Sequence, residues 1–269
     1  MILAIDIGSV NLIIAGLKNN EITDYVKLAT PETAADTTDV IIAGIVSNFN
    51  TAKIKEIIVG ISGSVANNCV AWCSNMGDDW ENYDLAGKLK KVFKVPVTLE
   101  NDANLAGLSE VANLAFTPKS AIYLSIGAGI GSSFIIDGHL VEGLLSSEAG
   151  MTNIEYDGVV REWEKFASGK AIYQAYGQLA EDIKSKQIWH AIVDRLARGI
   201  LVLIPIVQPE IIIIGGSMGQ NFRKYGKLLN DLIDEKLSSR LQRPRIIAAS
   251  QPELAVIYGA AIYAKNRHK

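Results

Sequence analysis

The sequence predicts an α/β protein built from two similar halves, each containing a mixed β-sheet, with a central cleft between them. Short apolar runs typical of strands alternate with longer segments whose apolar residues recur at helical spacing. An apolar strand, a glycine turn and a second strand occur in succession at residues 1–17 and again at 121–136. A chain of 269 residues is also long enough for one large domain or two lobes.

The first half begins with a β-meander. Apolar runs predict strands at residues 1–7, 12–17, 21–29, 57–61 and 96–99. Helical periodicity predicts helices at residues 31–49, 84–93 and 102–114. Pro31 supports the start of the first helix, because a first helical turn accommodates proline well.

The second half repeats this opening. Strands are predicted at residues 121–126 and 132–136, around Leu140, and at 210–214 and 245–249. Helices are predicted at residues 164–179, at 184–204, after Gly216 through Leu237, and at 253–265. The helix at 184–204 is expected to end before Pro205, because proline disrupts a helix interior. Since no Ser-rich, Pro-rich or charged linker separates the halves, we expect a short helical connection at residues 111–117.

Composition argues against several classes of protein. The 26 Lys and Arg residues are outweighed by 29 Asp and Glu residues, and a net charge of −3 offers no large positive field for nucleic acid. No apolar run reaches the roughly 20 residues of a membrane span. The first residues do not resemble a secretory signal, so we expect a cytoplasmic protein.

The cysteines and histidines predict no metal or nucleophile chemistry. Cys69 and Cys73 have no histidine nearby to complete a metal site, so we interpret both as plain thiols. The three histidines are scattered and accompany no Ser or Cys motif of the kind found in a hydrolase triad.

Three glycine turns follow predicted strands, at residues 6–9, 127–131 and 215–217. A turn without side chains lets backbone N–H groups approach phosphate oxygens. Each turn alone is more often only a conformational requirement of the backbone, but the set of three is stronger evidence for phosphate binding. None matches the P-loop, and residues 127–131 precede a strand where a dinucleotide fold would place a helix. Asp6 ends the first strand, where a carboxylate can hold Mg²⁺ directly or through water, or cap the turn.

The most specific stretch is Glu100-Asn-Asp-Ala-Asn104, where a strand passes into a helix. Asn101 or Asp102 would also serve as an ordinary helix N-cap. Residues 99–110 resemble the E-N-D-A-N-x-A-A-x-x-E signature of the ROK family of sugar kinases, which belong to the actin-like ATPase superfamily with its ribonuclease H-like fold. Six further segments resemble the family's motifs, at residues 6–9, 74–77 with Trp80, 125–131, 147–150, 164–169 and 214–217.

This resemblance implies a kinase that uses ATP and Mg²⁺ to phosphorylate a hexose, with glucose as the default, or an N-acylated hexosamine. Asp102 matches the catalytic base. The positions that match sugar contacts are Asn75, Asn101, Glu148 and Glu164. The positions that match nucleotide and phosphate contacts are Asp6, Gly8, Ser9, Asn11, Gly127, Gly129, Gly131, Gly215, Gly216 and Ser217, with Asp6 also the Mg²⁺ position.

The resemblance also implies an organisation. Residues 1–113 with 254–269 are expected to form the lobe that carries the first phosphate loop, sugar contacts and Asp102. Residues 114–253 are expected to form the lobe with the second phosphate loop and the nucleoside site. A homodimer is implied as well. We expect no membrane or nucleic-acid partner, and the chain leaves no room for the DNA-binding segment of the family's repressors before its first strand.

The chain departs from the family's pattern at two places. The first loop usually reads D-x-G-G-T-K, whereas Gly8 is followed here by Ser9, Val10 and Asn11. Met151 replaces the histidine of G-E-x-G-H, and no cysteine cluster follows, so the family's zinc site is not expected. Inorganic polyphosphate therefore stays open as the phosphoryl donor. A non-catalytic sugar-binding or nucleotide-binding module of the same fold is a second alternative.

Overall fold

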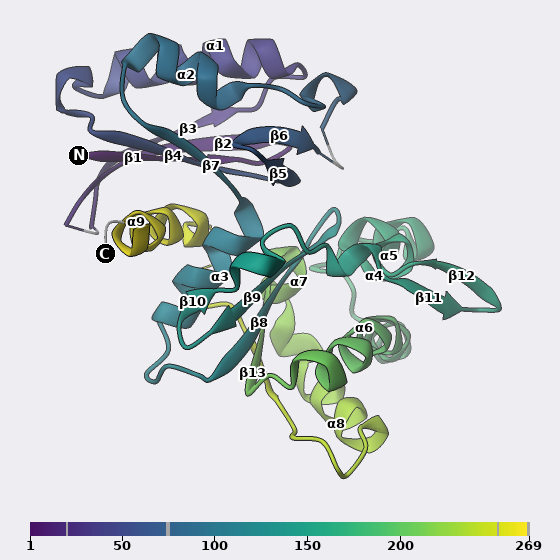
Figure 1. Ribbon diagram of the computed structural model, residues 1–269. Coiled ribbons are helices and arrows are strands. Elements are labelled where there is room, and N and C mark those ends of the chain that lie inside the picture. Colours follow the sequence, from purple (N-terminus) through teal and green to yellow (C-terminus); the bar gives the residue numbers. More distant parts are fainter. Residues whose placement is uncertain (20, 74–75, 252, 268–269) are drawn as a thin grey trace. The chain divides into compact units, whose positions relative to one another are not determined.

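The computed structural model describes residues 1–19, 21–73, 76–251 and 253–267. The chain divides into two compact units, Met1–Ser109 with Glu253–Lys269, and Glu110–Pro252 (Figure 1). The division lies within helix α3 (Asp102–Ala112), a few residues before the boundary expected from the sequence. Glu110 is the first residue of the second unit, and its carboxylate accepts hydrogen bonds from the backbone N–H groups of Ser250 and Gln251 of the same unit at 2.6 and 2.7 Å.

Unit 1 contains a five-stranded sheet in the order β3-β2-β1-β4-β7. Its strands are β1 (Ile2–Ile7), β2 (Asn11–Lys18), β3 (Glu21–Ala29), β4 (Glu56–Ile61) and β7 (Val97–Asn101). The first three are antiparallel, as the predicted meander requires, whereas β1, β4 and β7 run parallel. A short hairpin that periodicity did not predict, β5 (Ser64–Ala66) with β6 (Cys69–Trp72), precedes helix α2.

Helices cover both faces of this sheet. Figure 1 shows α1 (Ala34–Asn48) and α2 (Leu85–Phe93) on one face and α9 (Ala255–Arg267) on the other. Alternate residues of β1 follow this division, because successive side chains of a strand point to opposite faces. Leu3, Ile5 and Ile7 are buried in the cluster that includes residues of α1 and α2. Ala4 is buried with residues of α9.

Unit 2 repeats this architecture with the order β10-β9-β8-β13-β14. Its strands are β8 (Ser120–Ile126), β9 (Ile130–Ile136), β10 (His139–Leu140), β13 (Ile211–Gly215) and β14 (Arg245–Ala248). An antiparallel meander is again joined to parallel strands. The isoleucines of β13 are all buried, as their continuous run predicts.

The helices of unit 2 differ from the predicted ones in three places. The predicted helix at 164–179 is interrupted at Ser168, whose hydroxyl caps the second segment, giving α4 (Glu164–Ala167) and α5 (Gly169–Tyr176). Helix α6 (Lys186–Val207) passes through Pro205, so the expected end before this proline is wrong. Pro205 lies in the final turn, where only one backbone N–H is lost before the helix ends at Gln208.

The third difference is that the segment after Gly216 forms two helices, α7 (Gly216–Gln220) and α8 (Gly226–Lys236). Strands β11 (Asn153–Tyr156) and β12 (Val159–Glu162) were not predicted, although the Asp157-Gly158 turn between them, with positive φ at both residues, is a strong hairpin signal.

Single 3-10 turns lie at Thr51–Lys53, Asp78–Trp80, Glu142–Leu144, Ala149–Met151 and Phe222–Lys224. Within the described residues, no helix is both long and apolar enough to span a bilayer.

Candidate active site

Two carboxylates interact on the α9 face of the unit 1 sheet. Asp6 lies near the end of β1, two residues after Ala4, and pairs in register with Gly60 of β4. A Cβ atom at Gly60 would lie 3.7 Å from the Cα atom of Asp102 and 3.1 Å from Leu105 of α3. The glycine therefore allows the start of α3 to pack closely against the strand beside Asp6.

Burial raises the pKa of both carboxyls, and the charge of Asp102 also raises the pKa of Asp6. Burial raises the pKa of Asp102 to about 6, although hydrogen bonding from the Ala103 N–H at 2.8 Å acts in the opposite direction. Burial and the negative charge of Asp102 together raise the pKa of Asp6 to about 8. Asp102 is thus mostly ionised at neutral pH yet close enough to titration to accept a proton.

The neighbours of Asp102 form a hydrogen-bonded turn. The buried Glu100 accepts hydrogen bonds from the Asn101 N–H and from the Asn104 side chain, both at 2.8 Å. Asn101 caps α3 by accepting from the Asn104 N–H at 3.1 Å, and its Nδ2 donates to the Gly63 carbonyl at 2.8 Å. The helix-cap role weighed for Asn101 is therefore present. This network fixes the point at which the chain turns from β7 into α3.

The first glycine loop is held by a residue that sequence reasoning missed. The Gly8 N–H donates to the Asn11 carbonyl at 3.0 Å, closing the turn between β1 and β2. Thr30, just after β3, donates its hydroxyl to the Gly8 carbonyl at 2.7 Å and its N–H to the Val10 carbonyl at 3.0 Å. The side chains of Ser9, Val10 and Asn11 are exposed. The only sequence signal for these two hydrogen bonds is that Thr30 follows the strand next to β2.

In unit 2, two glycine turns meet because they follow neighbouring parallel strands. β8 and β13 are paired in parallel, so the turn after Ile126 and the Gly215–Ser217 segment lie at the same edge of the sheet. Gly216 has a φ of 67°, and a Cβ atom there would collide with the Ile126 backbone. A Cβ atom at Gly169, the first residue of α5, would lie 2.9 Å from the Gly127 carbonyl and 3.2 Å from the Ser217 hydroxyl.

We call this group of segments, residues 126–129, 169 and 215–217, the glycine cradle. Gly127 has no positive φ, and a Cβ atom there would meet nothing within 4 Å, so the fold does not itself require glycine at this position. The N–H of Gly127 donates to the Gly129 carbonyl at 3.0 Å. Gly131 lies within β9, paired with Ser125, rather than in the turn. Backbone amides and small side chains dominate the cradle, which suits an anion such as phosphate.

Two of the predicted sugar contacts flank the start of β9. Glu164, the first residue of α4, accepts a hydrogen bond from the Ile130 N–H at 3.3 Å. The buried hydroxyl of Ser132 donates to the Ser147 carbonyl and accepts from the Ala149 N–H, both at 3.1 Å. It therefore fixes the backbone on both sides of Glu148. No motif had indicated Ser132.

The predicted site residues thus fall into two groups. Asp6, Gly8, Ser9, Asn11, Asn101 and Asp102 lie in unit 1, and Gly127, Gly129, Gly131, Glu148, Glu164, Gly215, Gly216 and Ser217 lie in unit 2. Asn75 lies outside the described residues. In the described part of the chain, no group of three or more His, Cys, Asp or Glu side chains could hold a metal ion. Burial and the charge of Asp102 raise the pKa of the Cys73 thiol to about 12, which keeps it protonated.

Comparisons with known proteins identify the family and the fold. The family model described as "ROK family" matches residues 2–267. A fructokinase of Pediococcus pentosaceus is 25% identical over 261 residues, covering 88% of this chain and 85% of the relative.

Solved structures share the fold. A ROK family glucokinase from Streptomyces griseus, crystallised with glucose and AMPPNP, superposes with a TM-score of 0.82 at 21% identity, covering 98% of this chain and 99% of that one. The inorganic polyphosphate/ATP-glucomannokinase of Arthrobacter sp. strain KM gives a TM-score of 0.79 at 24% identity, covering 99% of each chain. The predicted α/β actin-like ATPase fold is therefore confirmed, and the chain belongs to the ROK family.

Proposed function

We propose that this protein is a sugar kinase that transfers the γ-phosphoryl group of ATP to a hydroxyl group of a hexose, with Asp102 as the base. The observation that carries the proposal is the partly buried Asp102 carboxylate, whose pKa is raised to about 6 at the start of α3. The family to which the chain belongs and the name of the fructokinase relative support the same reaction.

In this reaction the sugar oxygen forms a bond to the γ-phosphorus while the bond from that phosphorus to the departing ADP oxygen breaks. The hydroxyl proton passes to a carboxylate oxygen of Asp102. Because a carboxylate is a weak base for a free alcohol, we expect the proton to move late, and orientation of the hydroxyl to contribute most of the rate. The glycine cradle and the Gly8–Val10 turn are the segments that we propose to hold the phosphates and the nucleoside.

Mg²⁺ fits the carboxylate pair of unit 1. Burial raises the pKa of both Asp6 and Asp102, and the charge of Asp102 adds to the rise at Asp6, so a cation beside the pair would favour the ionised form of both. Two carboxylates make a partial ligand set, which suits an ion that usually keeps several waters and binds substrate phosphates. When bound, Mg²⁺ would neutralise charge on the phosphate oxygens. Asp6 is the residue that we propose to hold it, directly or through water.

The acceptor is proposed as a hexose, with glucose as the default and an N-acylated hexosamine as the alternative. Fructose and glucose should be the first sugars assayed, because one relative is named a fructokinase and one structural neighbour a glucokinase. Asn75, Asn101, Glu148 and Glu164 are the proposed sugar contacts, since polar side chains of this kind discriminate among hydroxyl patterns. A cytoplasmic homodimer is the proposed form, and light scattering would test the dimer.

The base is tested with Asp102→Asn in a coupled assay of ADP release. Turnover should be lost, while the rise in melting temperature that the sugar causes should stay nearly unchanged, because asparagine keeps the shape and the oxygen of the side chain. Retained turnover would refute the role of Asp102.

The phosphoryl donor must be identified by separate assays with ATP and with polyphosphate, because both a polyphosphate-dependent kinase and a non-catalytic module are open alternatives. The exposed Ser9, Val10 and Asn11 replace the family's usual residues, and one structural neighbour is named for both polyphosphate and ATP. Turnover with polyphosphate but not ATP would make the protein a polyphosphate-dependent glucokinase. Sugar or nucleotide binding without turnover from either donor would favour a non-catalytic module.

A further inference from the structure

Arg195 of α6 contacts the segment that carries one of the proposed sugar contacts. Its Nε donates a hydrogen bond to the Tyr156 hydroxyl at 3.0 Å, and its Nη1 donates to the Phe166 carbonyl at 3.2 Å. Tyr156 ends β11, and Phe166 lies in α4, whose first residue is Glu164. One guanidinium group therefore joins three elements, α6, β11 and α4.

Helix α4 is too short to hold itself in place. It contains only four residues, and its N-cap residue, Trp163, makes no side-chain capping hydrogen bond. The extended conformation of Ser168, with a ψ of 161°, ends the helix. In a continuous helix the Phe166 carbonyl would accept from the N–H of the residue four positions later. At this break in the helix, Arg195 donates to that carbonyl instead.

The break at Ser168 separates two parts of the proposed site within unit 2. Glu164 lies before the break and accepts a hydrogen bond from the Ile130 N–H at 3.3 Å. Gly169 follows the break and belongs to the glycine cradle. A change in the direction of α4 relative to α5 would therefore move the Glu164 carboxylate relative to the cradle. The hydrogen bond from Arg195 to α4 opposes such a change.

The Arg195 guanidinium is itself held on several sides. Its Cζ atom lies 5.3 Å from the ring centroid of Tyr156 and 5.2 Å from that of Tyr176, which ends α5. The ring of Tyr156 stacks on Phe166, with centroids 4.6 Å apart and planes within 1° of parallel. The Arg195 carbonyl accepts from the Trp163 indole N–H at 3.0 Å. A planar guanidinium that donates in two directions and faces two rings is well suited to fix its neighbours.

We infer that Arg195 is a positioning residue that fixes the bend between α4 and α5 and thereby places the Glu164 carboxylate in the sugar site. It contacts both sides of the bend, through the Phe166 carbonyl of α4 and the Tyr176 ring of α5. The inference rests on the proposed function in one respect, the assignment of Glu164 as a sugar contact.

Arg198 provides a matched control on the same helix. Its Cζ atom also lies close to the Tyr156 ring, 5.1 Å from the centroid. Within the described part of the chain, however, its hydrogen bonds and ion pairs go to Glu155 and Asp194 and reach neither α4 nor α5. A substitution of Arg198 therefore removes an arginine from the same ring without releasing the bend.

Arg195→Met tests the inference, because methionine keeps the apolar part of the side chain and removes both donors. Affinities for glucose and for fructose are measured by calorimetry for the natural chain, Arg195→Met, Glu164→Gln and the double variant. Arg195→Met alone should weaken sugar binding about fivefold or more. In the Glu164→Gln background the same substitution should change the affinity less than about twofold, because Arg195 acts through that carboxylate. Arg198→Met should leave the affinity unchanged.

A measurement without sugar separates this inference from the proposed function. The amide N–H signal of Ile130 in an NMR correlation spectrum reports the hydrogen bond to Glu164. Glu164→Gln and Arg195→Met should both shift this signal, whereas Arg198→Met should not. If neither sugar binds the natural chain, the proposed sugar specificity fails, and the Ile130 signal still decides the role of Arg195.

A milder variant covers the case in which Arg195→Met does not fold. Tyr156→Phe removes only the hydroxyl that accepts from the Arg195 Nε, and it should shift the Ile130 signal in the same direction by a smaller amount. The inference is overturned by an unchanged Ile130 signal in the folded variant, by additive effects of Arg195→Met and Glu164→Gln on sugar affinity, or by equal effects of Arg195→Met and Arg198→Met.

Discussion

At the scale of single residues, the burial of Asp102 affects both the stability of the fold and the proton transfer that we propose for this residue. Its carboxyl binds a proton more tightly in the folded chain than in the unfolded chain, because burial raises its pKa from 3.8 to about 6. Its contribution to folding is therefore favourable below pH 3.8 and is lost as the pH rises through 6. The ionised form of Asp102, which the proposed proton transfer requires, is the form that destabilises the fold.

This conflict predicts that Asp102→Asn is more stable than the natural chain at neutral pH. Its melting temperature without metal should exceed that of the natural chain above pH 6, and the difference should shrink toward zero near pH 3.8. The pKa of Asp6 should fall as well, because the charge of Asp102 contributes to raising it. Calorimetry across this range measures the difference. Asp24→Asn, at an exposed position in β3, should show no such trend.

Residues whose side chains hold distant backbone segments in place were the hardest to predict from the sequence. Thr30 closes the first loop, and Ser132 holds both neighbours of Glu148. Hydroxyl side chains of this kind carry no motif, and their partners are distant in the sequence. Glu100 and Asn104, in contrast, act within one local turn that the signature already contained.

At the scale of elements, the glycines of the cradle differ in whether the backbone itself requires a glycine. Gly216 has positive φ and no room for a Cβ atom. Gly127 has neither restriction. Glycine at position 127 therefore agrees with the proposed approach of a phosphate group to the turn between β8 and β9.

We expect Gly127→Ala to fold normally and to bind nucleotide poorly. Its melting temperature should stay within about 2 °C of the natural chain. The KM for ATP should rise at least about tenfold, because the added methyl group would occupy the proposed phosphate position. Thermal unfolding and initial-rate kinetics measure the two effects.

Gly138→Ala is the matched control for that variant. Gly138 lies in the turn between β9 and β10 with a φ of 79°. Alanine there should cost about 1 kcal/mol of stability without changing the KM for ATP. Equal KM values for all three proteins would contradict the role given to Gly127.

At the scale of the whole molecule, each unit has its own hydrophobic core. Leu3, Ile41 and Leu89 are buried in one cluster of unit 1, and Trp163, Ile200 and Ile212 in the cluster of unit 2. Each set of site residues is thus supported by a separate core, and ligands that bind one set should stabilise one unit first.

Hydrogen exchange measured by mass spectrometry tests this expectation. A non-hydrolysable ATP analogue without sugar should protect peptides that cover residues 125–131 and 214–218 of unit 2. Peptides of α1 and α2 in unit 1 should exchange as before, because no cradle residue belongs to those helices. The reverse pattern would show that the nucleotide site had been assigned to the wrong unit.

The sequence by itself determined the order of most strands and helices, the repeated architecture and the family. These features depend on local periodicity and on contiguous motifs such as residues 99–110. The β5–β6 and β11–β12 hairpins, the break at Ser168 and the continuation of α6 through Pro205 depend on neighbours or on single caps, which periodicity does not record.

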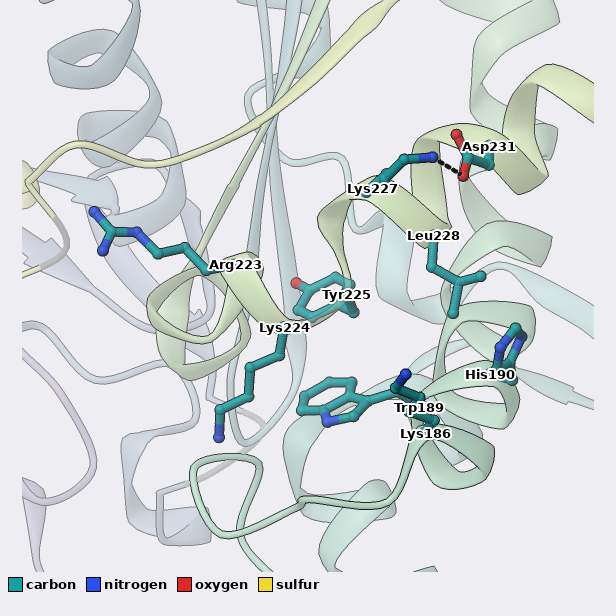
Figure 2. A pocket seen from close by; sticks show the side chains of 9 residues that line it. All are labelled: Lys186, Trp189, His190, Arg223, Lys224, Tyr225, Lys227, Leu228 and Asp231. Carbon is teal, nitrogen blue, oxygen red and sulfur yellow. Dashed lines mark hydrogen bonds and ion pairs between the residues drawn. The ribbon is translucent and has the colours of Figure 1, made fainter.

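Only the tertiary structure decided which of these residues meet. Asp6 and Asp102 are brought together because parallel pairing places β1, β4 and β7 side by side and Gly60 leaves room for α3. A cavity in unit 2 is lined by residues of α6 and α8 (Figure 2) and arises in the same way, since these residues are far apart in the chain and adjacent in space. Distances between such residues follow from packing, which no local pattern encodes.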